Sequence, residues 1–246
     1  MAFDYTNYKQ VEYIESDAST SQSMHGPYID LNLSGSHYWT RIRGYFTKTS
    51  GLQQCLYGYI YSNNHENIRV NANVNNVRGE IKNNSYTFNN IALNTIHVFD
   101  LEAFVNDAYF SIDGNTQSIT VGSEFNVGNR LLFAGNNNGA TTAVASFRMY
   151  YCKIFDYDGN LVRDLVPAQQ RSSPNKYGLY DTVGEQFYGT QNAYDFTGGP
   201  EVSTGCKTYV KVSGTWKEVD AVYVKVNGVW TQGDMNVKIS GTWKDS

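Results

Sequence analysis

Acidic and tyrosine side chains that could take part in acid–base chemistry are concentrated near residue 180. The segment from Gly178 to Pro200 is GLYDTVGEQFYGTQNAYDFTGGP, which places Asp181 and Glu185 close to several aromatic residues. A carboxyl group or a tyrosine can act as an acid, a base or a nucleophile in an enzyme. The same residues also occur where tight turns close a β-sheet domain, with Gly178 supplying a turn and the two acids lying in turns. The rest of the sequence decides between these interpretations.

A glycoside hydrolase needs two carboxylates, about 5 Å apart in a retaining enzyme, on one strand or on facing strands. The strand motif E-x-D-x-x-E of jelly-roll glucanases is absent. The segment EVDAVY begins like this motif at Glu218 but lacks the second glutamate. The sequence also lacks G-x-S-x-G and a phosphate-binding glycine loop. We therefore expect no catalytic residues and no enzymatic activity.

Metal-binding patterns are weak. The four histidines are scattered and no H-E-x-x-H motif is present, so we expect no zinc site. The segment DYDGN, from Asp156 to Asn160, resembles part of a calcium loop but lacks the spacing and the later glutamate of an EF-hand, and we interpret it as a hairpin turn. The three cysteines, Cys55, Cys152 and Cys206, are odd in number and widely spaced, which is typical of reduced thiols. We expect no cofactor, with calcium as an alternative that has no clear ligand set.

Two tyrosine- and arginine-rich strands are the candidate binding elements. In LYGYIYS, the three tyrosines share one face of a strand, and a row of tyrosines on a sheet can stack on sugar rings and donate hydrogen bonds. The alternative is that these rings form the inner layer of a sandwich or an interface with another subunit. In HYWTRIRGYF, Ile42 and Phe46 share one face, and Trp39 and the arginines share the other. The candidate ligand-binding residues are Tyr57, Tyr59, Tyr61, Trp39, Arg41 and Arg43.

The elements that would position these residues are β-strands. Apolar and polar residues alternate with a period of two in IRVNANV, from Ile68 to Val74, and in AYFSIDG, which ends in an Asp-Gly turn. FRMYYCKIF is apolar on both faces, which predicts a central strand. Turn signals such as Asn138-Gly139 recur at short intervals, and no stretch has sustained helical spacing. The pattern predicts an all-β sandwich or jelly roll.

Composition excludes several classes of partner. The chain has 246 residues, a net charge of −4 and no run of basic residues, so we expect no nucleic-acid partner. No apolar stretch is long enough to span a bilayer, so we expect no membrane insertion. The N-terminus lacks the basic and apolar regions of a signal peptide, which predicts folding in a cytoplasm.

The chain repeats itself after residue 203. YVKVSGTW is followed by YVKVNGVW and NVKISGTW, and each repeat predicts a hairpin with a two-residue Ser-Gly or Asn-Gly turn. Because a single hairpin is marginally stable in water, we expect the tryptophans of the repeats to form a shared core. They are Trp216, Trp230 and Trp243. We predict a domain over residues 1–202 and a three-repeat β-hairpin module over residues 203–246.

The segment from Lys153 to Pro200 reads KIFDYDGNLVRDLVPAQQ…YGLYDTVGEQFYGTQNAYDFTGGP, and an earlier one reads VEYIESDAS…GPYIDLNL. Together they resemble the closing and opening segments of laminin-G-like, concanavalin A-like jelly-roll domains of phage and prophage virion proteins and of some bacterial surface proteins. The resemblance spans residues from about Val11 to Pro200, but the central strands match only in pattern. It departs from the family at Ala168, where many relatives carry cysteine.

The resemblance implies a concanavalin A-like jelly roll, followed here by the hairpin module. It also implies a non-enzymatic virion component, in a fibre, a tail or a head decoration, that is made in the bacterial cytoplasm. We expect such a protein to contact other virion subunits, to form a homo-oligomer, with a homotrimer as the first expectation, and to adhere to host surface glycan. The alternatives are a virion decoration or assembly subunit without glycan binding, and a bacterial surface adhesin.

Overall fold

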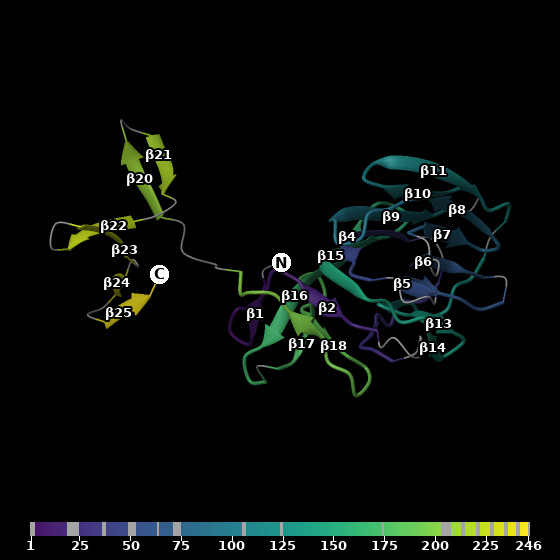
Figure 1. Cartoon of the computed structure of the whole chain (residues 1–246), viewed down its shortest axis with the longest axis horizontal. Helices are drawn as coiled ribbons and strands as arrows, with labels where there is room; N and C mark the ends of the chain where they lie inside the picture. The colour runs from purple at the N-terminus through teal and green to yellow at the C-terminus, as the bar shows by residue number, and fades with distance from the viewer. Residues whose placement is uncertain are drawn as a thin grey trace. The chain divides into compact units, whose positions relative to one another are not determined.

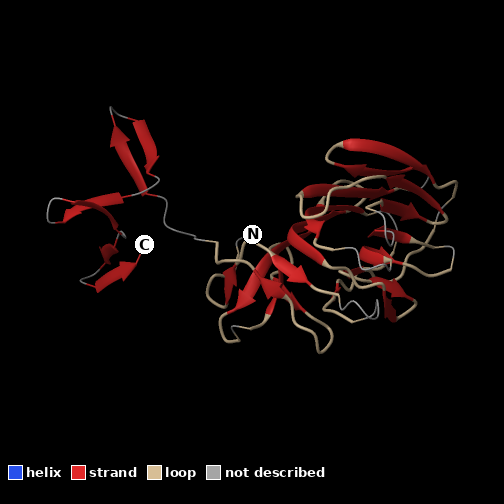
Figure 2. Cartoon of the chain, in the orientation of Figure 1, coloured by secondary structure: helices blue, strands red, loops and turns tan. Residues whose placement is uncertain are grey.

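The computed structural model describes residues 3–18, 25–35, 38–48, 53–62, 64–70, 75–104, 107–123, 125–173 and 175–202, and beyond them the backbone of six strands between residues 208 and 245. The chain divides into two compact units, Met1–Glu201 and Val202–Ser246. The described residues contain strands and turns but no helix, and therefore none that is long and apolar enough to cross a membrane (Figure 2). The first unit is an all-β sandwich of two sheets, as the alternating pattern predicts.

The larger sheet runs in the order β11-β10-β9-β4-β15-β16-β17-β18 (Figure 1). Strands β1, β2 and β19 pair outside this order, β1 with β16 and β2 with β15 and β19. Its strands are β1 (Tyr8–Gln10), β2 (Ile14–Ser16), β4 (Trp39–Phe46), β9 (His97–Ala103), β10 (Asp107–Ile112), β11 (Asn115–Thr120), β15 (Phe147–Phe155), β16 (Leu161–Gln170), β17 (Tyr177–Asp181), β18 (Gln186–Gly189) and β19 (Thr197–Gly198). Strand β15 lies between β4 and β16, so the prediction of a central strand is confirmed.

The smaller sheet runs in the order β14-β13-β5-β6-β7-β8, and β12 pairs with both β3 and β5. Its strands are β3 (Ile29–Asp30), β5 (Gln54–Tyr59), β6 (Glu66–Val70), β7 (Val77–Ile81), β8 (Asn84–Phe88), β12 (Leu131–Leu132), β13 (Gly135–Asn137) and β14 (Ala140–Thr142). Its named strands pair antiparallel except β13 with β5, and an isolated parallel bridge also joins Cys55 to Val144. The strand expected over residues 68–74 is confirmed as far as Val70, and residues 71–74 lie outside the described chain.

The core lies between the two sheets. Phe46, Phe99 and Phe147 of the larger sheet make edge-on ring contacts at 5.0–6.0 Å between centroids. The ring of Phe110, also in the larger sheet, covers Gly79 of the smaller sheet so closely that a Cβ at Gly79 would lie 2.3 Å from it. Offset and edge-on aromatic contacts add to the hydrophobic stabilisation of burial. The aromatic content of the sequence therefore serves mainly to fill this layer.

The acid-rich segment near residue 180 forms the hairpin β17–β18, so it is structural. Glu185 lies in the turn with φ 53°, as expected. Two expectations are wrong. Gly178 is inside β17 rather than in a turn, where a Cβ would lie 2.3 Å from the carbonyl oxygen of Tyr188. Asp181 is a fully buried strand residue that accepts the backbone amides of Asp164, which lies on the neighbouring strand β16, and of Val183, which lies in the turn after β17.

In the described part of the second unit the strands form three two-stranded sheets. They are formed by β20 (Thr208–Val212) with β21 (Thr215–Val219), β22 (Val222–Val226) with β23 (Val229–Gly233), and β24 (Asn236–Ile239) with β25 (Thr242–Asp245). The three expected strand pairs are present, and in each register a lysine is opposite a tryptophan: Lys211 with Trp216, Lys225 with Trp230 and Lys238 with Trp243. The expected tryptophan core falls on side chains outside the described part of the chain.

Candidate functional site

The row of tyrosines proposed as a binding platform is not exposed as a row. Tyr57 is 0% exposed, Tyr59 is 8% exposed and Tyr61 is 43% exposed. The Tyr57 hydroxyl donates to Glu66 at 2.8 Å inside the core, and burial raises the pKa of Tyr57 well above its ordinary value. Tyr57 therefore cannot contact a ligand, and its assignment is corrected to the inner layer of the sandwich. The physical reason is that all six residues of β5 are buried.

Strand β4 has the predicted two faces. Ile42 and Phe46 are buried, whereas Trp39 is half-buried and Arg43 is exposed on the opposite face. Trp39 stacks on Phe155 with 4.5 Å between ring centroids. Whether this face binds a ligand stays a prediction.

A pair of carboxylates on β9 is a feature that the search for E-x-D-x-x-E missed, although the spacing D-x-E in a strand would have signalled it. Asp100 and Glu102 are two residues apart on one face of the strand. Burial, followed by the charge of Asp100, raises the pKa of Glu102. Asp100 accepts hydrogen bonds from Trp39 Nε1 at 3.0 Å and Arg41 Nε at 2.6 Å. These bonds tie β4 to β9, so we assign Asp100 a structural role.

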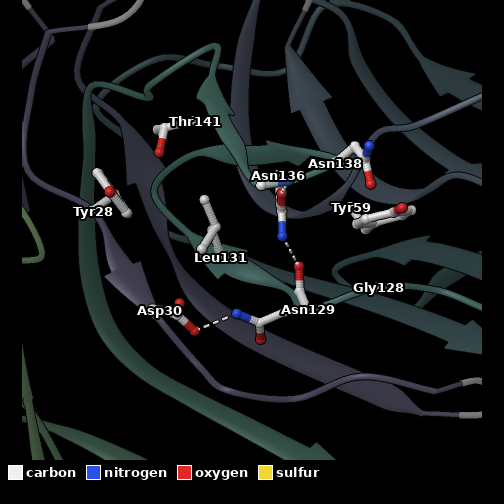
Figure 3. A pocket seen from close by; sticks show the side chains of 10 residues that line it. Tyr28, Asp30, Tyr59, Gly128, Asn129, Leu131, Asn136, Asn138 and Thr141 are labelled. Atoms are coloured by element: carbon white, nitrogen blue, oxygen red, sulfur yellow. Dashed lines mark hydrogen bonds between the residues drawn. The ribbon is translucent and has the colours of Figure 1, made fainter.

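A cleft of about 430 Å³ lies beside the smaller sheet (Figure 3). Strands β3, β5 and β12 and the β13–β14 hairpin supply its walls. Its volume falls in the range of small-molecule sites, about 300–1,000 Å³. The lining residues are Tyr28, Asp30, Tyr59, Gly128, Asn129, Leu131, Asn136, Asn138, Gly139 and Thr141. Of the residues predicted for ligand binding, the cleft contains Tyr59.

The β13–β14 hairpin is built by its turn residues. Asn138 has φ 50° and Gly139 has φ 91°, as an Asn-Gly hairpin turn requires. Asn136 stabilises the turn because its side-chain oxygen accepts the Gly139 amide at 2.7 Å. The Asn136 side-chain amide donates to the backbone oxygen of Asn129 at 2.5 Å, which links the hairpin to the opposite wall (Figure 3).

Asp30 is the one acidic residue among the described residues that line the cleft. Its Oδ1 accepts the Asn32 backbone amide at 2.7 Å. The same oxygen accepts the Asn129 side-chain amide at 2.5 Å (Figure 3). Its Oδ2 accepts no hydrogen bond from any residue in the described ranges. The carboxylate is therefore held in place by one oxygen, and the other is available to a ligand.

The aromatic wall of the cleft is Tyr59. Its ring lies against Gly128, where a Cβ would be only 2.4 Å from the ring carbon Cε2. The neighbouring ring of Tyr61 is edge-on to it at 6.4 Å. Gly58, with φ 132°, has no room for a side chain because a Cβ would lie 2.0 Å from the Glu66 carbonyl oxygen. The glycine at 128 thus leaves room for the Tyr59 ring, and the glycine at 58 allows the close approach of β5 to β6.

Arg130 anchors the strand segment that carries two lining residues, Asn129 and Leu131. It is fully buried and forms a two-pronged ion pair with Glu66, with 2.6 Å for each contact. It also donates to the carbonyl oxygens of Leu33 at 3.2 Å and Gly35 at 2.7 Å. The Glu66 charge helps to raise the pKa of Arg130, although desolvation is the largest influence and opposes it. The Arg130 side chain therefore adds to the backbone hydrogen bonds that already join the segments around residues 33 and 130.

The other chemically reactive groups are tied into structure. Within the described ranges, no group of three or more His, Cys, Asp or Glu side chains is arranged to hold a metal ion. In DYDGN, Asp156 accepts the backbone amide of Asn160 at 2.8 Å, which confirms the hairpin-turn interpretation, and the Asn160 side chain lowers the pKa of Asp156. Cys55 and Cys152 are free and buried, as expected for reduced thiols, and Cys206 lies outside the described residues.

No protein-family model and no curated protein matches the sequence. A solved structure with some similarity is that of the mouse laminin α1 chain, domains LG4-5, at 13% sequence identity and a TM-score of 0.40. The similarity covers 63% of this chain and 43% of that chain, less than half of its length. A similarity this slight carries no conclusion about ligands or partners.

Proposed function

We propose that the sandwich is a saccharide-binding domain and that the cleft around Asp30 and Tyr59 is its binding site. The observation that carries this proposal is the Asp30 carboxylate, which is oriented by two hydrogen bonds and keeps one free oxygen in the cleft that the Tyr59 ring also lines. A vicinal pair of sugar hydroxyls donates well to a carboxylate, and the apolar face of a sugar ring packs on an aromatic ring. Asn138 and Thr141, which also line the cleft, add polar groups that can pair with further hydroxyls.

The charge of the cleft favours a neutral ligand. Among the described residues that line it, Asp30 is the only ionisable group other than the two tyrosines, so a sugar that carries a carboxylate or a phosphate would meet a like charge. The same count supports binding without hydrolysis, because a glycosidase places two carboxyl groups about the scissile bond. We therefore propose a non-catalytic lectin-like role.

We further propose that the chain belongs to a phage particle and uses this domain to contact host surface glycan. The support for this step is the sequence resemblance between Val11 and Pro200 to domains of virion proteins. The proposed setting also makes a weak single site useful, because an oligomer that carries several copies binds a glycan-coated surface by avidity.

The test is calorimetric titration of the full chain with a panel of neutral oligosaccharides, followed by the variant Asp30→Asn. An asparagine oxygen can still accept from Asn32 and Asn129, but a donor replaces the free acceptor. Loss of a charged hydrogen bond predicts affinity about 10- to 100-fold weaker.

Asp158→Asn is the matched control, because Asp158 is exposed in the turn between β15 and β16. This variant should bind saccharide like the unmodified chain. Tyr59→Leu should also weaken binding, because it removes the aromatic wall. The proposal is wrong if no neutral saccharide binds, or if Asp30→Asn binds as tightly as the control.

A further inference from the structure

The outer face of the larger sheet carries an irregularity that changes which side chains it presents. The pairing of β15 with β4 shifts register between Met149 and Tyr151, so one extra residue is inserted in β15. As a result the buried residues Met149 and Cys152 flank two consecutive half-buried tyrosines, Tyr150 and Tyr151. A regular strand would have turned one of them into the core. Bulges are often found where a side chain is redirected for a function.

Four cations lie on this face, in strands β4 and β15, and three of them are neutralised. Arg41 pairs with Asp100 at 2.6 Å, Arg148 with Glu15 at 2.6 Å, and Lys153 with Asp164 at 3.5 Å. The fourth, Arg43, is the most exposed, and it has no acidic partner among the residues that the structure describes. Its neighbours in the adjacent strands are Val98 and Tyr151.

Tyrosine rings hold the guanidinium groups in place. The Arg43 guanidinium carbon lies 5.4 Å from the centre of the Tyr150 ring. Arg148 lies 3.8 Å from the Tyr13 ring and 5.3 Å from the Tyr45 ring. Tyr150 also contacts the Tyr13 ring edge-on at 5.9 Å. Contacts of this kind order an arginine that would otherwise sample many rotamers, which lowers the entropic cost of binding.

The tyrosine hydroxyls around Arg43 remain available. Those of Tyr13, Tyr45, Tyr150 and Tyr151 form no hydrogen bond with any described residue. Burial raises the pKa of Tyr45, so its hydroxyl keeps its proton and remains a donor at neutral pH. The face therefore combines one uncompensated planar cation with several hydroxyl donors. That set matches a ligand with a carboxylate and many oxygen acceptors.

We propose that the outer face of β4 and β15 is a second binding surface, which takes a carboxylate-bearing polysaccharide. Arg43 pairs with a sugar carboxylate, and the hydroxyls of Tyr45, Tyr150 and Tyr151 bond to ring and hydroxyl oxygens of the same chain. A polymer fits better than a small ion, because the donors are spread over an open sheet face rather than gathered in a cleft. This surface is separate from the cleft at Asp30 and differs from it in the charge it selects.

The test is calorimetric titration of the full chain at low ionic strength with an oligomer of galacturonate. The matched neutral probe is the same oligomer with its carboxylates methyl-esterified. We expect the acidic oligomer to bind, the ester to bind at least 10-fold more weakly, and added salt to weaken the acidic complex. Arg43→Gln should weaken binding of galacturonate about 10- to 100-fold. Arg43→Lys, which keeps the charge but loses the planar fork, should retain part of the affinity.

Lys176→Gln is the control, because it also removes one exposed cation, a partner of Asp195, from the same unit. It should bind galacturonate like the unmodified chain. Unfolding profiles that superimpose for Arg43→Gln and the unmodified chain establish that the exposed substitution leaves the fold intact. Equal binding of the acid and the ester, no binding of galacturonate by the unmodified chain, or unchanged affinity in Arg43→Gln would each overturn the proposal. None of these results depends on whether neutral sugars bind at Asp30.

Discussion

Replacing Arg130 with methionine should be among the most damaging single changes in the sandwich. Arg130 and Glu66 have side-chain exposures of 0% and 1%, so the change leaves a carboxylate in the core with the Tyr57 hydroxyl as a remaining donor. Breaking a buried pair in this way costs about 3–5 kcal/mol. The Gly35 carbonyl oxygen also loses its donor, which adds about 1–3 kcal/mol. The sum of about 4–8 kcal/mol compares with a total stability of about 5–15 kcal/mol for ordinary domains.

The assay is urea and thermal unfolding of the full chain, monitored by circular dichroism. At about 2–4 °C per kcal/mol for a unit of this size, Arg130→Met should lower the midpoint by roughly 10–30 °C. The double variant Arg130→Met with Glu66→Gln removes the stranded charge and should regain a measurable part of the loss. Arg78→Met is the control, because Glu80 would still form its ion pair with Arg69 at 2.6 Å after Arg78 is removed. This substitution should lower the free energy of unfolding by about 1 kcal/mol or less. If the double variant is no more stable than Arg130→Met, the loss does not come from an uncompensated charge and the reasoning fails.

Three further predictions follow from the sequence and the burial of individual groups. In the variant Cys206→Ser, a thiol reagent at pH 8 should label no cysteine until the protein is unfolded. The reason is that burial raises the pKa of Cys55 to about 12 and also raises the pKa of Cys152. Rapid labelling of the native chain would contradict this prediction. Trp230→Ala should make the hairpin module sensitive to limited proteolysis and leave a stable fragment of about 200 residues, because truncating a buried Trp costs about 3–5 kcal/mol. A hairpin module that stays protected from the protease would refute a tryptophan core. Sedimentation of the full chain should give a homotrimer, and a monomer at micromolar concentration would count against it.

The local sequence predicts the strands of this protein well because alternation is a local property. A strand has a side-chain period of two, so the faces of β4 and the turn at Asn138-Gly139 follow from their own residues. The same information fails for Tyr57. Alternation states that residues 57, 59 and 61 share a face, but it does not state whether that face, the opposite one or both are covered by other parts of the chain.

The candidate sites show the same limit more strongly. Asp30 and Asn129 are 99 residues apart in the sequence and meet only because β12 pairs with β3. Nothing in the residues around Asp30 distinguishes it from a turn aspartate. The D-x-E spacing on β9 can be recognised in the sequence, but the structural role of Asp100 depends on hydrogen-bond donors that lie on β4. Sites built from several strands are therefore invisible to motif searches unless each strand carries a recognisable signature.

The amino-acid sequence by itself determined the β class, the strand faces, the hairpin turns and the repeated tail, because these depend on residues within a few positions of one another. The tertiary structure decided which faces are inside, which carboxylates are compensated and which cation is left over. Those properties are sums over neighbours from distant strands, and burial and charge pairing have no meaning until the sheets are packed. Arg43 and Arg41 are two residues apart in one strand, yet within the described chain only Arg41 pairs with a carboxylate, because β9 places Asp100 opposite Arg41 and Val98 opposite Arg43.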